Sequence, residues 1–239
     1  MRTWLVFVAA ILVLALASAT VVADPYLSIW EMETADTSVT NSWIGSTGMV
    51  LTPTAKTCVP QGMIGSYHWI DVDPDAGDVW SVNVGITGNL EIGAARLGKD
   101  LTGGDAEVVA NAKYNLDLGR WTENPEAPEV AVGVWDIGNE VNRTYYLVVT
   151  QDLEIAEEAQ VSSLRASIGY ADSDANTGTM DGVFGGIEFV PFESGLVKLE
   201  YDADDFNAAL LYSWSDKLSL EIGSIDGDLG LGVNFQTGF

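Results

Sequence analysis

The C-terminal residues 229–239 have the sequence LGLGVNFQTGF, in which two kinds of residue alternate. Leu, Val and Phe occupy most odd positions, whereas Gly, Asn and Gln occupy even ones. Because successive side chains of a strand point to opposite faces, this pattern predicts a strand with one apolar face and one small or polar face. Such a strand ends at the last residue, Phe239, and pairing with the first strand of a closed sheet would satisfy its backbone.

The same period of two recurs upstream. The segments EVVANAKYNLDL (107–118), LVKLEYDA (196–203) and LSLEIGS (218–224) all alternate in this way. About twelve such segments follow one another between residues 63 and 239, separated by residues that favour turns. This spacing is typical of an all-β barrel or sandwich.

The polar face of these segments decides between the two architectures. It interleaves glycines with charges, and the charged residues are Glu91, Lys113, Arg165, Glu188, Lys198, Glu200 and Glu221. In a barrel this face points inward, where space is short and opposite charges neutralise each other. We therefore predict a closed antiparallel transmembrane β-barrel of about 12 strands, with these charges lining the lumen. The alternative is a soluble secreted β-sandwich that binds carbohydrate or calcium.

One hairpin allows a register to be predicted. If the turn in PFESG (191–195) is centred on Glu193, then Glu188 lies opposite Lys198 and Gly186 lies opposite Glu200. Opposite charges that face each other across two strands stabilise their pairing. We expect an ion pair between Glu188 and Lys198 inside the barrel, and the alternative is a solvated cross-strand pair.

The N-terminal part of the chain has a different character. Residues 1–23 combine one Arg, a long uncharged run and small-x-small sites before Asp24, which is typical of a secretory signal peptide. An uncleaved membrane anchor is the alternative. Residues 24–62 are irregular and predict an N-terminal extension or a lumen plug, so the barrel proper spans 63–239. Cys58 is the only cysteine, which excludes an internal disulfide.

The charge balance restricts the partners. The chain has 35 acidic and 10 basic residues, and a net charge of −25 repels nucleic acid. Short turns fall at one end of the predicted strands, and longer acidic loops fall mostly at the other end. This layout is typical of outer-membrane barrels and predicts a lipid bilayer as the surrounding medium.

Several motifs together resemble the YjbH-like family of outer-membrane barrel proteins. They include NVGITGNLEIGAARL (83–97), AVGVWDIG (131–138), DGVFGGIEF (181–189) and EYDADDFNAAL (200–210). The resemblance implies an envelope protein of a diderm bacterium, linked with exopolysaccharide production and export and with its export machinery. The terminal Phe239 resembles the C-terminal signal of bacterial outer-membrane proteins, which implies recognition by the barrel-assembly machinery.

Two acidic loops are candidates for a divalent cation such as Ca²⁺ or Mg²⁺, because clustered oxygen ligands suit these ions. The candidate ligands are Asp71, Asp73, Asp75, Asp78, Asp172 and Asp174. Neither loop has the Gly and Glu positions of an EF-hand, so solvated loops are the alternative. We predict no other cofactor.

Two patterns suggest enzymatic chemistry, and each has a simpler explanation. Ser66 and His68 share one strand face, but side chains two apart on a strand run parallel and do not converge. Glu200 and Asp202 suggest glycoside hydrolysis, but a short acidic hairpin explains them equally well. We therefore expect a non-enzymatic barrel, either an exopolysaccharide-linked envelope component or a narrow pore for polar solutes.

Overall fold

The computed structural model describes residues 39–71, 77–124, 127–153, 163–174, 180–192 and 194–238. The strands are β1 (Gly62–Ile70), β2 (Gly77–Gly85), β3 (Leu90–Leu97), β4 (Glu107–Asn115), β5 (Glu129–Trp135) and β6 (Thr144–Leu153). They continue with β7 (Leu164–Ser173), β8 (Gly182–Phe192), β9 (Gly195–Tyr201), β10 (Phe206–Ser213), β11 (Leu218–Ile225) and β12 (Asp228–Gly238). Two short helices, α2 (Lys99–Thr102) and α3 (Leu118–Thr122), were not predicted from the sequence.

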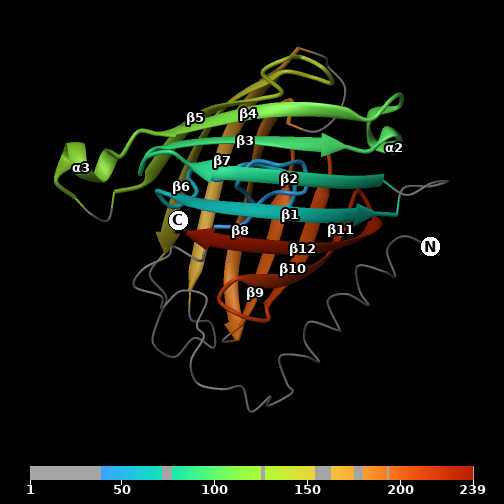
Figure 1. The fold of residues 1–239 in the computed structure, drawn as a ribbon. Helices are drawn as coiled ribbons and strands as arrows, with labels where there is room; N and C mark the ends of the chain where they lie inside the picture. Colours follow the sequence, from blue (N-terminus) through green and yellow to red (C-terminus); the bar gives the residue numbers. More distant parts are fainter. Residues whose placement is uncertain are drawn as a thin grey trace.

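The twelve described strands form one closed barrel in which each strand pairs antiparallel with its sequence neighbours (Figure 1). The closing pair is β1 with β12, in register from Gly62 opposite Gly238 to Ile70 opposite Gly230. The predicted closed antiparallel barrel is therefore confirmed, and the β-sandwich alternative is wrong. Closure pairs the backbone of the C-terminal strand along its length, as a sheet surrounded by hydrocarbon requires.

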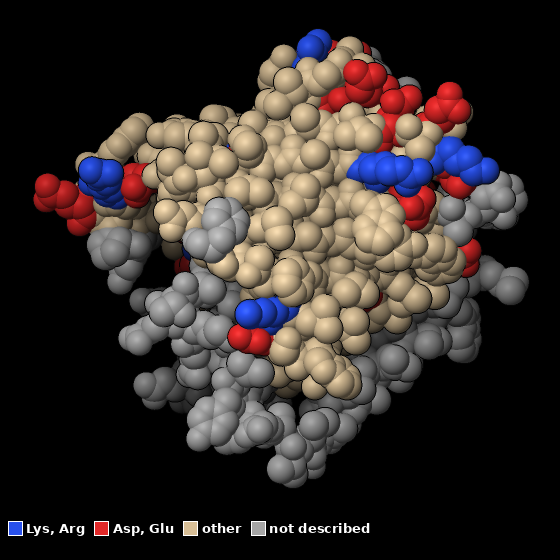
Figure 2. All heavy atoms as spheres, viewed as in Figure 1, with Lys and Arg blue, Asp and Glu red and all other residues tan. Residues whose placement is uncertain are grey.

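The two faces of the sheet differ as the alternation predicts. Leu199 and Leu220 point outward and are 40% and 42% exposed, whereas Glu188 and Glu221 point inward and are 2% and 3% exposed. On the face seen in Figure 2, most charged side chains lie toward the ends of the barrel, and the wall between them is largely uncharged. Exposed aromatic residues near the strand ends include Trp80, Tyr145, Tyr170, Phe206, Tyr114, Tyr212, Trp214 and Phe235. An apolar outer band, aromatic residues near its borders and a polar interior are the features of an outer-membrane β-barrel.

The two ends of the barrel are unlike each other. The turn end, which carries α3 and the C-terminus at the left of Figure 1, has the short connections 86–89, 193–194 and 214–217. The connections from β4 to β5 and from β6 to β7 also start and end at this end of the barrel. The loop end, which carries α2, has the remaining connections between β1 and β12.

The core of the molecule lies inside the barrel, where the plug, residues 39–61, fills the lumen. Every plug residue from 39 to 55 is buried except the half-buried Ile44. Val39 and Cys58 pack together with Ile64 near the turn end. Trp43 packs against Ile70 and Ile225 at the loop end. The plug therefore enters and leaves at the turn end, and its tip reaches the loop end.

The plug has its own hydrogen-bonded turns. Trp43 N donates to Val50 O at 2.7 Å, and Gly48 N donates to Thr40 O at 2.8 Å. Gly45 sits between plug and wall with φ +109°, and a Cβ at this position would lie 2.4 Å from Ala95 Cβ. Only glycine combines this backbone conformation with so close an approach to the wall.

Several predicted features lie outside the described residues: the signal peptide at 1–23, residues 24–38 of the N-terminal extension, the candidate metal ligands Asp73 and Asp75, and the assembly signal at Phe239. No helix in the described part of the chain is both long and apolar enough to span a bilayer.

Candidate functional site: a plugged lumen

All seven residues predicted to line the lumen point into the barrel, and none of them is more than 3% exposed. They are Glu91 on β3, Lys113 on β4, Arg165 on β7, Glu188 on β8, Lys198 and Glu200 on β9, and Glu221 on β11. Charges buried this deeply need partners, because an unpaired one costs several kcal/mol, of the order of 3–5. Many of these partners belong to the plug.

Glu200 is bound by the plug backbone. Its carboxylate accepts hydrogen bonds from the amides of Val50, Leu51 and Thr52 at 3.1, 2.6 and 3.2 Å. The Thr52 hydroxyl donates to it at 2.8 Å, and Asn207 Nδ2 of β10 donates at 3.2 Å. Three consecutive amides that converge on one oxygen pair form an anion-binding concavity, here built by the plug around a wall carboxylate.

Glu91 and Lys113 hold the middle of the plug from the opposite wall. Glu91 accepts hydrogen bonds from Thr47 N at 3.1 Å, Thr47 Oγ1 at 2.6 Å and Cys58 N at 2.7 Å. Lys113 Nζ donates to the carbonyls of Thr47 at 2.8 Å and Thr54 at 3.2 Å, and contacts the Thr47 hydroxyl. The two side chains also lie 3.8 Å apart as an ion pair. Through this pair, the wall satisfies both hydrogen-bond donors and hydrogen-bond acceptors of the plug.

A second charged group surrounds the tip of the plug. Lys198 Nζ lies 3.0 Å from Glu221 Oε1 and donates to Met49 O at 3.2 Å. Glu221 Oε2 lies 3.5 Å from His68 Nε2. The His68 ring stacks on Trp43 of the plug, with centroids 4.7 Å apart and planes at 14°. The one histidine of the chain therefore serves as a packing surface for the plug.

The predicted ion pair between Glu188 and Lys198 is corrected by the structure. The register is as predicted, with Glu188 opposite Lys198 and Gly186 opposite Glu200. However, Lys198 pairs with Glu221, whereas Glu188 lies 3.7 Å from Arg165 on its other neighbour, β7. In a narrow closed lumen, long side chains reach across more than one strand, so register alone does not fix the pairs.

At the turn end, Lys56 of the plug anchors to two strand ends. It forms ion pairs with Glu129 of β5 and with Asp152 of β6, the latter at 3.4 Å. Burial and the nearby Arg165 lower the pKa of Lys56, but Glu129 and Asp152 outweigh them and raise its pKa overall. Lys56 therefore keeps its positive charge at neutral pH.

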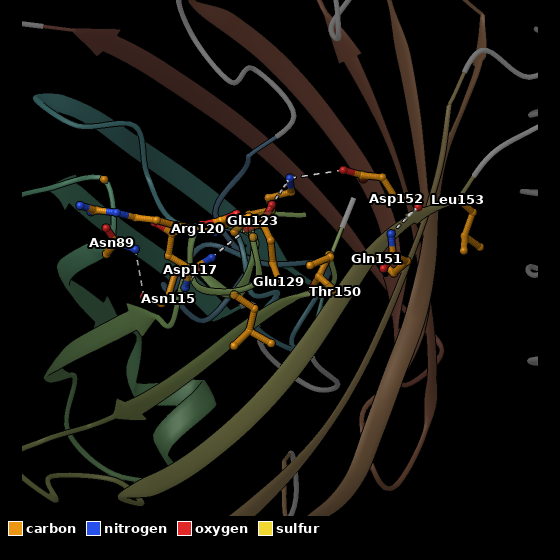
Figure 3. A pocket seen from close by; sticks show the side chains of 15 residues that line it. Asn89, Asn115, Asp117, Arg120, Glu123, Glu129, Thr150, Gln151, Asp152 and Leu153 are labelled. Carbon is orange, nitrogen blue, oxygen red and sulfur yellow. Dashed lines mark hydrogen bonds and ion pairs between the residues drawn. The ribbon is translucent and has the colours of Figure 1, made fainter. Parts of the chain in front are cut away.

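Next to Lys56, a cavity of about 1070 Å³ forms a vestibule at the turn end. It lies between the 116–128 connection and the end of β6, and Figure 3 shows Asp117, Glu129 and Asp152 around it. Its charged lining residues are Lys56, Asp117, Arg120, Glu123, Glu129 and Asp152. The vestibule is a polar, predominantly acidic mouth of the plugged lumen.

The acidic loops show no metal cage in the described residues. Asp78 pairs with Arg96 at 3.2 Å and Asp174 pairs with Arg143 at 2.9 Å. Within the described ranges, no three His, Cys, Asp or Glu side chains gather as metal ligands. Asp71 and Asp172 are exposed at the loop end, whereas Asp73 and Asp75 lie outside the described residues. A divalent-cation site in these loops stays a prediction.

The loop end nevertheless concentrates negative charge. Desolvation and the neighbouring carboxylates of Asp226, Asp204 and Asp202 raise the pKa of Asp205. Asp202 itself accepts hydrogen bonds from the amides of Asp204 and Asp205, at 3.0 and 2.9 Å, and so shapes the β9–β10 turn. The pair Glu200 and Asp202 has no open side for a sugar, since one side chain binds the plug and the other binds the turn.

The hydrolase hypothesis for Ser66 and His68 also lacks the required geometry. Ser66 Oγ donates to Asn234 Oδ1 at 2.6 Å. Among the described residues, His68 Nδ1 has no hydrogen-bond partner. A nucleophilic serine needs a base within hydrogen-bond distance, and this pair runs side by side along β1.

Sequence reasoning missed the residues of the plug that make the site. Asn83 Nδ2 donates to Asn41 Oδ1 at 2.8 Å and to Gly45 O at 2.7 Å, and Trp135 Nε1 donates to Ile44 O at 3.0 Å. Composition could have indicated that this segment is enclosed, because residues 39–61 contain a single charged side chain, Lys56, among small and polar residues.

In sequence, the chain matches no protein-family profile and no curated protein. In structure it is similar to the KdgM porin in complex with disordered oligogalacturonate, with TM-score 0.48, 12% identity, and coverage of 74% of this chain and 99% of that one. It is also similar to the KdgM porin, with TM-score 0.45, 13% identity and the same coverage. A mutant of the Rh. blastica porin aligns with TM-score 0.35 and 13% identity over 67% of this chain and 55% of that one.

The buried Cys58 provides a probe of the seated plug. Burial, followed by the nearby charge of Glu91, raises the pKa of the Cys58 thiol to about 11 from 9.0. Since the thiolate is the reactive form, this shift alone slows alkylation at pH 8 roughly a hundred-fold. We expect Cys58 to resist maleimide in the folded protein and to react fully after unfolding, as measured by mass spectrometry. Rapid labelling of the folded protein would show that the plug is not seated.

Proposed function

We propose that this protein is a pore for small polar solutes in the outer membrane of a diderm bacterium, held closed by residues 39–61. One observation carries the proposal: the charged groups of the lumen wall bind the backbone of the plug, at Glu200 and Glu91 above all. A barrel that never opens would not need a polar lining, because an apolar lining could pack against its plug equally well. Polar walls suit a lumen that meets water when the plug is absent.

The way in which the plug is held supports its release. Polar contacts (hydrogen bonds, ion pairs and ring stacking) seat the plug together with apolar packing at its tip and near its chain ends, and both chain ends of the plug lie at the turn end. Withdrawal therefore requires no threading of the chain through the barrel. Water can replace each lost hydrogen bond once the lumen is open.

No enzymatic step is part of this proposal. The geometry of Ser66, His68, Glu200 and Asp202 favours packing and plug binding instead of catalysis.

Conductance in a planar bilayer tests the proposal. We expect the wild-type protein to remain mostly closed, whereas a variant lacking residues 39–58 conducts steadily. Gly45→Val provides a point variant, because a side chain here clashes with Ala95 in a backbone conformation that favours glycine. Folding of each variant is checked by its resistance to mild detergent. Equal steady conductance of the wild type and the folded variants would contradict closure by the plug.

The exopolysaccharide link is a second proposal, and it is supported by the YjbH-like motifs and by the vestibule. Asn89, Asn115 and Gln151 line this cavity together with its carboxylates, and amide and carboxylate groups suit the hydroxyls of a sugar. Loss of the protein should then reduce exported polysaccharide, measured as secreted hexose per cell. Unchanged export, with solute uptake reduced, would favour the pore alone. Insertion by the barrel-assembly machinery through Phe239 belongs to the same proposal.

A further inference from the structure

The inner wall carries more acid than base. Among the described strand positions that face the lumen, eight side chains are acidic and three are basic. The acids are Glu91, Glu107, Glu129, Asp152, Glu188, Glu200, Glu221 and Asp228, and the bases are Lys113, Arg165 and Lys198. The surroundings of the lumen have a low dielectric constant, so the negative electrostatic potential of these excess acids is concentrated inside the lumen.

The three bases have acidic partners on the wall itself. Lys113 lies 3.8 Å from Glu91, and Lys198 lies 3.0 Å from Glu221. Arg165 contacts Asp152 at 2.8 Å and Glu188 at 3.7 Å. These pairs stay available when the plug leaves, so the bases remain neutralised.

Two of the acids depend instead on the plug. Glu200 enters no ion pair among the described residues, and four of its hydrogen bonds come from plug residues 50–52. Glu129 pairs with Lys56 of the plug, and its other oxygen accepts a bond from Asn115. The plug thus supplies hydrogen-bond donors and one positive charge to carboxylates that its departure leaves unneutralised.

The vestibule at the turn end of the lumen also has more acidic than basic side chains. Its lining has four carboxylates, from Asp117, Glu123, Glu129 and Asp152, against the cations of Lys56 and Arg120. Lys56 is part of the plug, so withdrawal removes one of these two cations. The opened path then runs from an acidic mouth to a lumen wall with unpaired carboxylates.

We infer that the open lumen selects for cations, and that its solutes are small polar molecules with a positive charge. The inference deepens the proposed function and rests on it. The seated plug occupies, with its amides and with Lys56, the positions that permeant cations take in the open state. A polyanionic solute would meet repulsion at the mouth and again at Glu200.

The test is the reversal potential of opened full-length channels across a tenfold KCl gradient. Gly45→Val and Gly230→Ala are expected to serve as two independent opened variants. An added side chain would clash with Ala95 in the first and with Trp43 of the plug in the second, and every wall charge stays in place. We expect the potential to shift toward that of potassium, with a potassium-to-chloride permeability ratio several-fold above one. Adding Glu200→Gln or Glu129→Gln should lower this ratio, whereas Asp216→Asn, an exposed residue of the β10–β11 turn, should not.

The outcomes separate the inference from the proposed function. Conductance with a reversal potential near zero, or shifted toward that of chloride, overturns the cation selectivity and leaves closure by the plug intact. A ratio that does not respond to Glu200→Gln or Glu129→Gln overturns the assignment to the plug-bound carboxylates. Absence of conductance in both folded variants overturns the proposed function, and the inference with it.

Discussion

Replacing Glu200 by alanine is expected to release the plug from the lumen. The substitution leaves the amides of Val50, Leu51 and Thr52 without their acceptor in a buried site. A buried donor that loses its partner costs about 1–3 kcal/mol. Three such donors should therefore weaken docking by about 3 kcal/mol or more, which corresponds to at least a hundred-fold shift in the docking equilibrium.

Cleavage by trypsin after Lys56 measures this release, because Lys56 is the one basic residue of the plug. Its rate, followed by mass spectrometry relative to cleavage after the exposed Lys99, should rise strongly in Glu200→Ala. Glu200→Gln keeps one acceptor oxygen and should give an intermediate rate. Asp216→Ala removes an exposed carboxylate from a turn and provides the matched control. Equal protection of Lys56 in Glu200→Ala and in the control would show that Glu200 does not hold the plug.

Replacing Gly230 by alanine is expected to displace Trp43. A Cβ at Gly230 would lie 1.9 Å from Trp43 Cζ3 and 2.2 Å from Cη2. The indole is fully buried and stacks on His68, so it cannot shift by the required distance within its site. Overpacking of this kind costs about 1–3 kcal/mol. We expect a lower unfolding midpoint in urea together with faster cleavage after Lys56.

Gly65→Ala is the matched control, since Gly65 lies on the outward face of β1 and its added Cβ would meet only Ser81 O at 3.8 Å. The double variant Trp43→Ala, Gly230→Ala removes both clashing groups. It should be less destabilised than the sum of the two single variants, because the sites are in contact. Strict additivity, or a Gly230→Ala variant as stable as Gly65→Ala, would contradict the proposed packing of Trp43 on the wall.

The barrel could be predicted from the sequence because apolar residues alternate with small or polar residues in the same way along each strand. Gly230 and Gly232 alternate with Leu229 and Leu231, and one face must be lined with small residues once the sheet closes. The register of Glu188 opposite Lys198 was predicted from a turn centred on Glu193 and is confirmed, although Phe192 pairs with Gly195 and the register shifts between Phe189 and Phe192. Period and turn geometry are local properties, so a single sequence carries them.

A plug could be predicted from the sequence, but its position in the lumen and its contacts with the wall could not. Its residues have no period, and its decisive contacts join positions far apart in the chain, as between Leu51 and Glu200. Which carboxylate meets which amide depends on the three-dimensional path of residues 39–61. The same reason explains the wrong ion pair, because Lys198 reaches Glu221 only in the closed barrel.

The central claim is that residues 39–61 are seated inside the closed barrel, and hydrogen exchange of the unmodified protein in lipid nanodiscs tests it most directly. Peptides that cover residues 47–58 contain the amides of Thr47, Leu51 and Cys58, which bind wall carboxylates. We predict that these amides exchange as slowly as those of strands β9 and β10. Exchange within seconds, as expected for the exposed residues 103–106, would show that the plug does not occupy the lumen.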